Sequence, residues 1–141
     1  MDVKLRNMTS VYITGEEGIL CLYRIGSRVA DKKYIGSAGG HFEEGDLEGL
    51  KLRYVTHRLK DGEIRQNYYY FASLIGKREL HSREGKLEWI PYEGFVDLVM
   101  PVSAKNMILH YLEKGRFDSV LYGGITTPEG TVFVPMTDFE G

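Results

Sequence analysis

The stretch LKLRYVTHRLKDGEIRQNYYYFASL, residues 50–74, contains the pattern that decides the fold. Apolar and charged side chains alternate over its first part, which is typical of a β-strand and places Tyr54 and Arg53 on opposite faces. The dipeptide Asp61-Gly62 then favours a tight primed turn, and the aromatic-rich residues after it favour a returning strand. The stretch therefore predicts a β-hairpin.

Shorter strands are predicted on both sides of this hairpin, where β-branched and aromatic residues cluster between glycines. They cover residues 8–14, 19–25, 34–38, 87–91 and 131–136. Helical spacing is clear only over residues 103–114, where Ser103 is the expected N-cap. The apolar stripe of this helix consists of Ala104, Met107, Ile108, Tyr111 and Leu112. Many strands and one helix in mixed order predict an α/β (α+β) fold with a mixed sheet.

Length and composition limit the classes of protein that the chain can belong to. Its 141 residues predict a single domain over residues 1–141. The net charge of -2 argues against binding a nucleic acid polymer, and no apolar run approaches the length of a membrane span. The single cysteine, Cys21, lies in an apolar run and is expected to be a buried thiol. We expect a cytoplasmic protein, since nothing near Met1 has the layout of a signal peptide.

The segment Gly39-Gly40-His41-Phe42-Glu43 resembles the start of the Nudix box, the signature of the MutT-like diphosphate hydrolases. The flanking segments are similar to that family in the same order and cover most of the chain. They are residues 22–24 and 34–38 before the box, and residues 50–74, 84–89, 103–114 and 121–124 after it. The resemblance implies a Nudix-type α/β/α sandwich with a mixed sheet.

The complete box of that family reads G-x5-E-x7-R-E-U-x-E-E-x-G-U, where U is apolar. Divalent cations neutralise the diphosphate and activate the attacking water. Magnesium prefers hard oxygen ligands, and glutamates three and four residues apart on one helix face supply them. With Gly40 as the first glycine, Asp46 takes the first acidic position. The Arg-Glu and Glu-Glu pairs would then fall on Tyr54-Val55 and Arg58-Leu59, so the metal-binding helix is absent.

A second alignment treats residues 45–49 as the end of the loop that follows this helix in the family. A gap of roughly twenty residues, the length of a helix and its loop, then borders Glu43 or Glu44. Either the helix has been lost, or a segment is missing from this sequence. The close fit on both sides favours the deletion or omission of a whole segment over gradual decay.

The resemblance implies a metal site and a catalytic acid. The Gly39 carbonyl and the carboxylates of Glu43 and Glu44 would be metal ligands, and Glu84 would reach the metal or the attacking water. The alternatives are a simple Gly-Gly turn and a solvated loop charge at Glu84. Few ligands remain, so we expect Mg2+, or Mn2+, to bind weakly.

Two arginines border the implied phosphate cleft. Arg24 and Arg28 could bind phosphates as forked donors, or be solvated surface residues. The aromatic run 68–71 could stack on a base, although alternate members of such a strand usually fill the core.

Together these features predict a hydrolase of nucleoside di- or triphosphate derivatives that is impaired without its helix. Its partner would be a small-molecule nucleotide derivative. The alternatives are a catalytically dead nucleotide-binding module and a structural protein that forms a homodimer through the aromatic hairpin.

Overall fold

The computed structural model describes residues 4–16, 18–24, 34–37, 44–75, 86–98 and 100–136. The strands are β1 (Lys4–Thr14), β2 (Gly18–Arg24), β3 (Tyr34–Ser37), β4 (Leu47–Lys60), β5 (Glu63–Leu74), β6 (Lys86–Pro91), β7 (Tyr122–Thr127) and β8 (Gly130–Pro135). The helices are α1 (Val102–Glu113) and the short 3-10 helices η2 (Glu44–Asp46), η3 (Tyr92–Asp97) and η4 (Gly115–Phe117). Among the described residues, no helix is long and apolar enough to cross a membrane.

The strands hydrogen-bond in the order β3-β2-β1-β5-β4-β7-β8, and β6 pairs with β2. The sheet is mixed, because β4 and β7 run parallel while β7 and β8 run antiparallel. The described residues form several strands and one α-helix, which makes an α+β fold and confirms the predicted class.

Two compact units can be described, and each draws on parts of β1, β4 and β5. The helix unit consists of Met1–Ser10, Leu52–Tyr70 and Val102–Gly141. The β6 unit consists of Val11–Lys51 and Phe71–Pro101.

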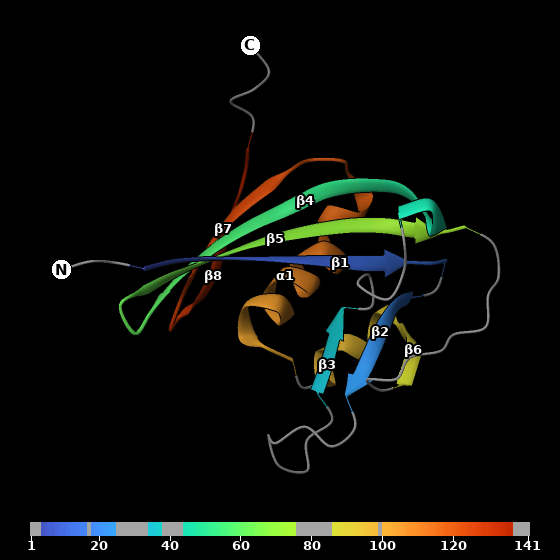
Figure 1. Ribbon diagram of the computed structural model, residues 1–141, viewed down its shortest axis with the longest axis horizontal. Helices are drawn as coiled ribbons and strands as arrows, with labels where there is room; N and C mark the ends of the chain where they lie inside the picture. The colour runs from blue at the N-terminus through green and yellow to red at the C-terminus, as the bar shows by residue number, and fades with distance from the viewer. Residues whose placement is uncertain are drawn as a thin grey trace. The chain divides into compact units, whose positions relative to one another are not determined.

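The predicted hairpin is formed by β4 and β5, the two long green strands of Figure 1. Its two turn residues, Asp61 and Gly62, have φ values of 54° and 72°. Positive φ at both central residues is what a type I′ turn requires, and this turn matches the twist of the flanking strands. The turn prediction from Asp61-Gly62 is therefore confirmed.

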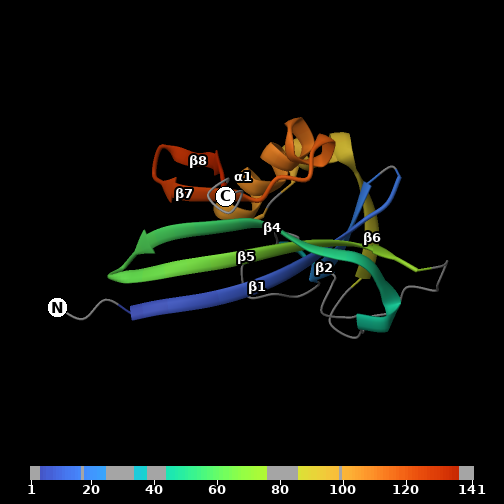
Figure 2. The same ribbon diagram turned by 90° about the horizontal axis from the view of Figure 1, so that it is seen from above.

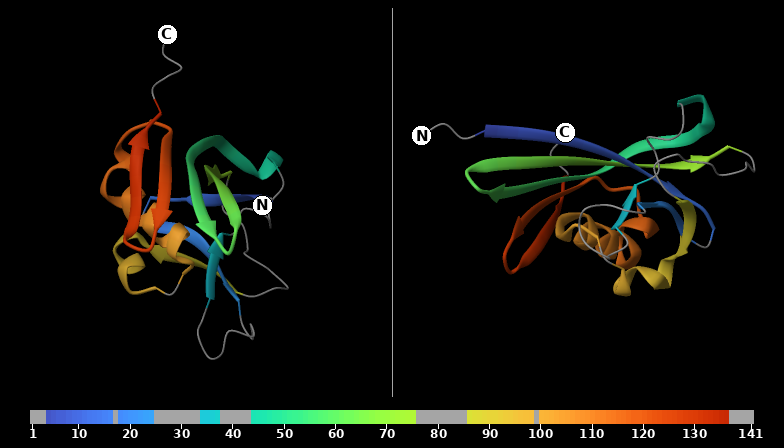
Figure 3. Two further views of the ribbon diagram at one scale, coloured as in Figure 1. Left: turned by 90° about the vertical axis from the view of Figure 1, so that its left-hand side faces the viewer. Right: turned by 60° about the horizontal axis from the view of Figure 1, so that its bottom comes forward.

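In the helix unit, β4 pairs in parallel with β7, which in turn forms a hairpin with β8 (Figure 3). Tyr54 lies opposite Tyr122 and Thr56 opposite Gly124. We did not predict β7, because its Gly123-Gly124 pair has low strand propensity. Strand β7 lies between β4, which is distant in the sequence, and β8, which follows it after a short turn, and these partners make it a strand.

Helix α1 lies next to the β7–β8 hairpin (Figure 2). Its predicted stripe is largely confirmed, because four of the five residues are buried and Leu112 is half-buried. Ser103 is not the N-cap, since the helix starts at Val102. The Ser103 hydroxyl instead donates toward Thr126 Oγ1 at 3.5 Å, which links α1 to β7.

The β6 unit is built around β2, which pairs antiparallel with β1, β3 and β6. Ile13, Leu20 and Leu87 form its core, with Leu47 and Leu74 packed against it. Cys21 is free and fully buried, and burial raises the pKa of its thiol to about 12. A protonated, inaccessible thiol agrees with the prediction that Cys21 belongs to the core.

Candidate functional site

The six residues implied by the family resemblance all lack a described side chain. Arg24 ends β2 opposite Tyr34, and Glu44 begins η2, but only their backbone positions are described. Four others lie outside the described residues: Arg28, Gly39, Glu43 and Glu84. Their roles in metal and phosphate binding therefore stay predictions.

The box positions counted from Gly40 fall on β4. Tyr54 is fully buried and Val55 is nearly so, and Arg58 and Leu59 continue the same strand. Strand side chains alternate between two faces, so these residues cannot form the carboxylate row that a helix would carry. The positions given by the first alignment thus form no helix. The second alignment treats residues 45–49 as a loop, but β4 already begins at Leu47; the hairpin expected after this loop is observed.

No cluster of three or more His, Cys, Asp or Glu side chains suited to a metal occurs among the described residues. Between β3 and β4 the described chain contains only the three-residue helix η2, after which Leu47 enters β4 directly. The donor atoms that the resemblance implies, at Gly39, Glu43, Glu44 and Glu84, are not among those that the structure describes, so the metal site stays a prediction.

A buried polar cluster that we did not predict lies in the helix unit, centred on Arg53. The guanidinium donates from Nη2 to the carbonyl of Gly115 at 2.5 Å and from Nε to the carbonyl of Val120 at 3.2 Å. It also donates to the Asp118 backbone and to Asp118 Oδ1, both at 3.1 Å. Arg53 thereby ties β4 to the segment that connects α1 with β7.

Asp118 is held by this arginine and by two further donors. Tyr122 donates its hydroxyl to Asp118 Oδ2 at 2.6 Å, and the Val120 amide donates to Oδ1 at 3.0 Å. The hydrogen bond from Tyr122 is the main cause that lowers the pKa of Asp118. The carboxylate is therefore ionised at neutral pH, where it balances the charge of Arg53.

Tyr54 and His110 form a second polar contact next to this cluster. The Tyr54 hydroxyl shares a 2.7 Å hydrogen bond with His110 Nδ1, and the Tyr54 ring stacks on Tyr122. On its other side the imidazole lies 4.5 Å from the ring centre of Phe133. Burial lowers the pKa of His110 and raises that of Tyr54, so both side chains are neutral near pH 7.

The polar groups of this cluster have a structural role. The Arg53 bonds are made to protein carbonyls and to a carboxylate, and Asp118 already accepts from Arg53, Tyr122 and Val120. Buried polar groups that are satisfied in this way fix one arrangement of their elements. We therefore assign Arg53 and Asp118 to the stability of the helix unit and not to ligand binding.

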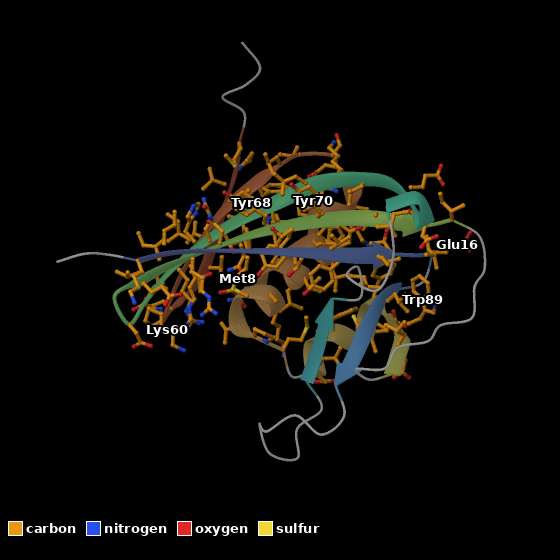
Figure 4. All side chains as sticks on the ribbon, viewed as in Figure 1. Met8, Glu16, Lys60, Tyr68, Tyr70 and Trp89 are labelled. Atoms are coloured by element: carbon orange, nitrogen blue, oxygen red, sulfur yellow. The ribbon has the colours of Figure 1, made fainter. Side chains whose placement is uncertain are left out.

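The aromatic run on β5 divides between two faces. Tyr69 and Phe71 are buried, and Phe71 stacks on Tyr12 with ring centres 5.7 Å apart. Tyr68 and Tyr70 are half-exposed along the strand (Figure 4). Alternate members fill the core as predicted, which leaves two tyrosines accessible for contacts with a ligand or partner.

No sequence model of a protein family matches this chain, and no curated protein sequence matches it. The chain is similar to solved structures, among them the crystal structure of a mutator MutT protein from Bacillus halodurans, with a TM-score of 0.57. The two chains are 14% identical, and the match covers 91% of this chain and 97% of the other. At this level of identity the comparison shows a shared fold, and that fold is the one the sequence resemblance implied.

Proposed function

We propose that this chain is a MutT-like scaffold for a nucleoside di- or triphosphate derivative. Its natural activity would be the hydrolysis of a diphosphate bond, and the 141-residue form would be impaired in that reaction. The proposal is supported by the fold, which matches a MutT protein over almost the full length of both chains. It is also supported by the order of the segments around Gly39-Gly40.

One observation supports the impairment: the described residues between β3 and β4 form only the three-residue helix η2, and the positions counted from Gly40 lie on strand β4. Tyr54 and Val55 form part of the core, where the charged Arg-Glu pair of the box would have to be buried. A chain that forms strand β4 over these positions cannot place glutamates there on one helix face. Hydrolysis of a diphosphate would then lack the groups that hold its cations.

Magnesium or manganese belongs to the proposal as a weakly bound cofactor. The residues that would hold it are Gly39, through its carbonyl, and Glu43 or Glu44, with Glu84 near the reacting water. The metal would supply charge neutralisation and a more acidic water. Arg24 and Arg28 would bind the phosphates of the substrate.

A magnesium-dependent hydrolysis assay on the 141-residue protein tests the proposal. It would use a panel of nucleoside triphosphates and dinucleotide diphosphates, with calorimetric binding of the same compounds. We expect nucleotide binding with slow, metal-dependent turnover, and weaker binding in Arg24→Ala than in the matched surface variant Arg6→Ala. Turnover as fast as that of an intact MutT protein would show that the chain is not impaired.

Two alternatives have distinct outcomes in the same assay. Binding with no turnover under any metal would favour a dead nucleotide-binding module. If the chain showed no nucleotide binding and no turnover, this result would reject the proposal and favour a structural protein. An intact mass well above 16.1 kDa for the natural protein, by about twenty residues, would show that a helix-sized segment exists.

A further inference from the structure

Strand β8 is the last strand in the hydrogen-bonding order, and its outer side pairs with no strand of the described residues. Two of its side chains are strongly exposed although they are apolar, with 68% exposure for Val132 and 58% for Val134. Ile125, the neighbour of Val132 on β7, is 62% exposed. The edge of the sheet therefore combines an open backbone with an apolar face, which proteins normally avoid.

The hydrogen-bond pattern identifies the backbone groups that point outward. The Met136 amide donates to the Leu121 carbonyl at 2.8 Å, which continues the β7–β8 register by one pair. In an antiparallel ladder bonded and non-bonded pairs alternate, so Val134 and Val132 also bond to β7. The backbone groups of Thr131 and Phe133 consequently point away from the sheet.

Pro135 occupies the next outward position. Proline has no N–H to donate, so this residue limits the open edge to two amide donors. A strand that paired here would use both groups of Thr131 and of Phe133, and only the carbonyl of Pro135. Because of this restriction, one pairing register satisfies more of the outward backbone groups than any other.

We propose that β8 pairs antiparallel with β8 of a second copy of this chain, around a two-fold axis at Val132. In this register Thr131 of one copy exchanges two hydrogen bonds with Phe133 of the other, and the symmetric pair adds two more. Both amide donors are then satisfied, and the missing N–H of Pro135 is not needed. Val132 meets Val132 of the second copy in a non-hydrogen-bonded pair.

The charge distribution favours a second copy as the partner. Strand β8 has no charged side chain, so two copies meet without like-charge repulsion. The first residues of β1 form the opposite edge of the helix unit, because β2 is in register with β1 only at Ile13 and Thr14. That edge carries the exposed charges of Lys4 and Arg6, which is a common protection of edges against pairing.

Sedimentation equilibrium over the micromolar range tests the interface. We expect a monomer–dimer equilibrium whose Kd rises at least about 100-fold in Val132→Lys, because two valines lose apolar contact and two charges face each other. Leu5→Lys, at an exposed apolar position on the β1 edge, should leave the Kd unchanged. Circular dichroism checks that both variants stay folded. A monomer at all concentrations, or equal Kd values for both variants, would reject the proposal.

Cysteine cross-linking tests the register separately. In a non-hydrogen-bonded antiparallel pair the Cα atoms lie about 4.5 Å apart, within the range of a disulfide. Val132→Cys should therefore form a covalent dimer on oxidation. Val134→Cys is the matched control on the same face, because its counterpart in the second copy would lie four residues along the strand. Cross-linking through Val134→Cys and not Val132→Cys would overturn the register, and cross-linking through neither would overturn the interface.

Discussion

His110 is a histidine that the fold holds in its neutral form. Burial is the main cause that lowers its pKa, and the nearby charge of Lys114 acts in the same direction. In the unfolded chain the imidazole binds a proton near pH 6.5. Over the interval from this value down to the lowered pKa, the unfolded state therefore binds more protons than the folded state. Stability is fully present above pH 6.5 and is lost as the pH falls through this interval.

We predict that His110→Gln makes the free energy of unfolding less dependent on pH below about 6.5. Urea unfolding of the protein and the variant between pH 5 and pH 8 measures the two slopes. Tyr54→Phe is the control, because it removes the hydrogen bond to Nδ1 but leaves the burial of the ring. It should lose stability over the whole pH range, and its stability should still fall below about pH 6.5, because the burial that lowers the pKa of His110 remains. Equal slopes for His110→Gln and the unchanged protein would contradict the assignment.

Arg53 shows what the sequence could not indicate at the scale of single residues. The alternation of apolar and charged residues correctly predicts that Arg53 lies in a strand. It does not predict that Arg53 is buried, since charged residues are normally exposed. Its acceptors belong to Gly115, Asp118 and Val120, more than sixty positions away in the chain. Only the tertiary fold brings these carbonyls to β4. A local pattern cannot reveal such a contact.

At the scale of elements, the hairpin β4–β5 was predictable because its turn is encoded by two adjacent residues. Strand β7 was not, since its two central glycines argue against a strand. Close packing nevertheless favours glycine at position 124, because a Cβ atom would lie 2.9 Å from the Phe133 ring. Elements with local signals could be predicted, and elements defined by their neighbours could not.

Strand β2 gives a prediction at this scale. A Cβ atom on Gly18 would collide with the carbonyl oxygen of Ile90 on β6 and lie 2.7 Å from its carbonyl carbon. Backbone cannot rotate away as a side chain can, so Gly18→Ala must separate β2 from β6. We expect a loss of about 1–3 kcal/mol in the free energy of unfolding, measured with urea. Gly45→Ala, with nothing within 4 Å, should be neutral. Equal stability of both variants would contradict this close packing.

At the scale of the whole molecule, the fold was predictable further than the site. The resemblance rests on the order of segments along the chain, and a matching order gives a matching fold. The site depends on where Glu84 and Arg28 lie relative to Gly39, which sequence order alone does not determine. Their described neighbours in β2, β3 and η2 contribute no metal cluster. The sequence could therefore assign these site residues only through the resemblance to the family.

Metal binding gives the prediction at the scale of the molecule. We expect the nucleotide-free protein to bind magnesium weakly, because magnesium retains its waters and needs several carboxylates or substrate phosphates. Calorimetric titration should show measurable binding only when a nucleotide is present. Glu84→Gln should reduce this binding, while Glu129→Gln on the β7–β8 turn should not. A micromolar site in the nucleotide-free protein that disappears in Glu84→Gln would show that the chain holds a complete metal site.

The parallel pairing of β4 with β7 also determines the order in which the chain can assemble. Tyr54 and Tyr122 are adjacent in the sheet but far apart in sequence, so a long loop must close before they meet. On the ribosome, the β4–β5 hairpin can form from local contacts long before residue 122 is synthesised. Until then, the aromatic surface of Tyr54 and the charge of Arg53 have none of their partners from β7 and η4. The nascent chain therefore passes through a stage in which its central hairpin is exposed to other chains.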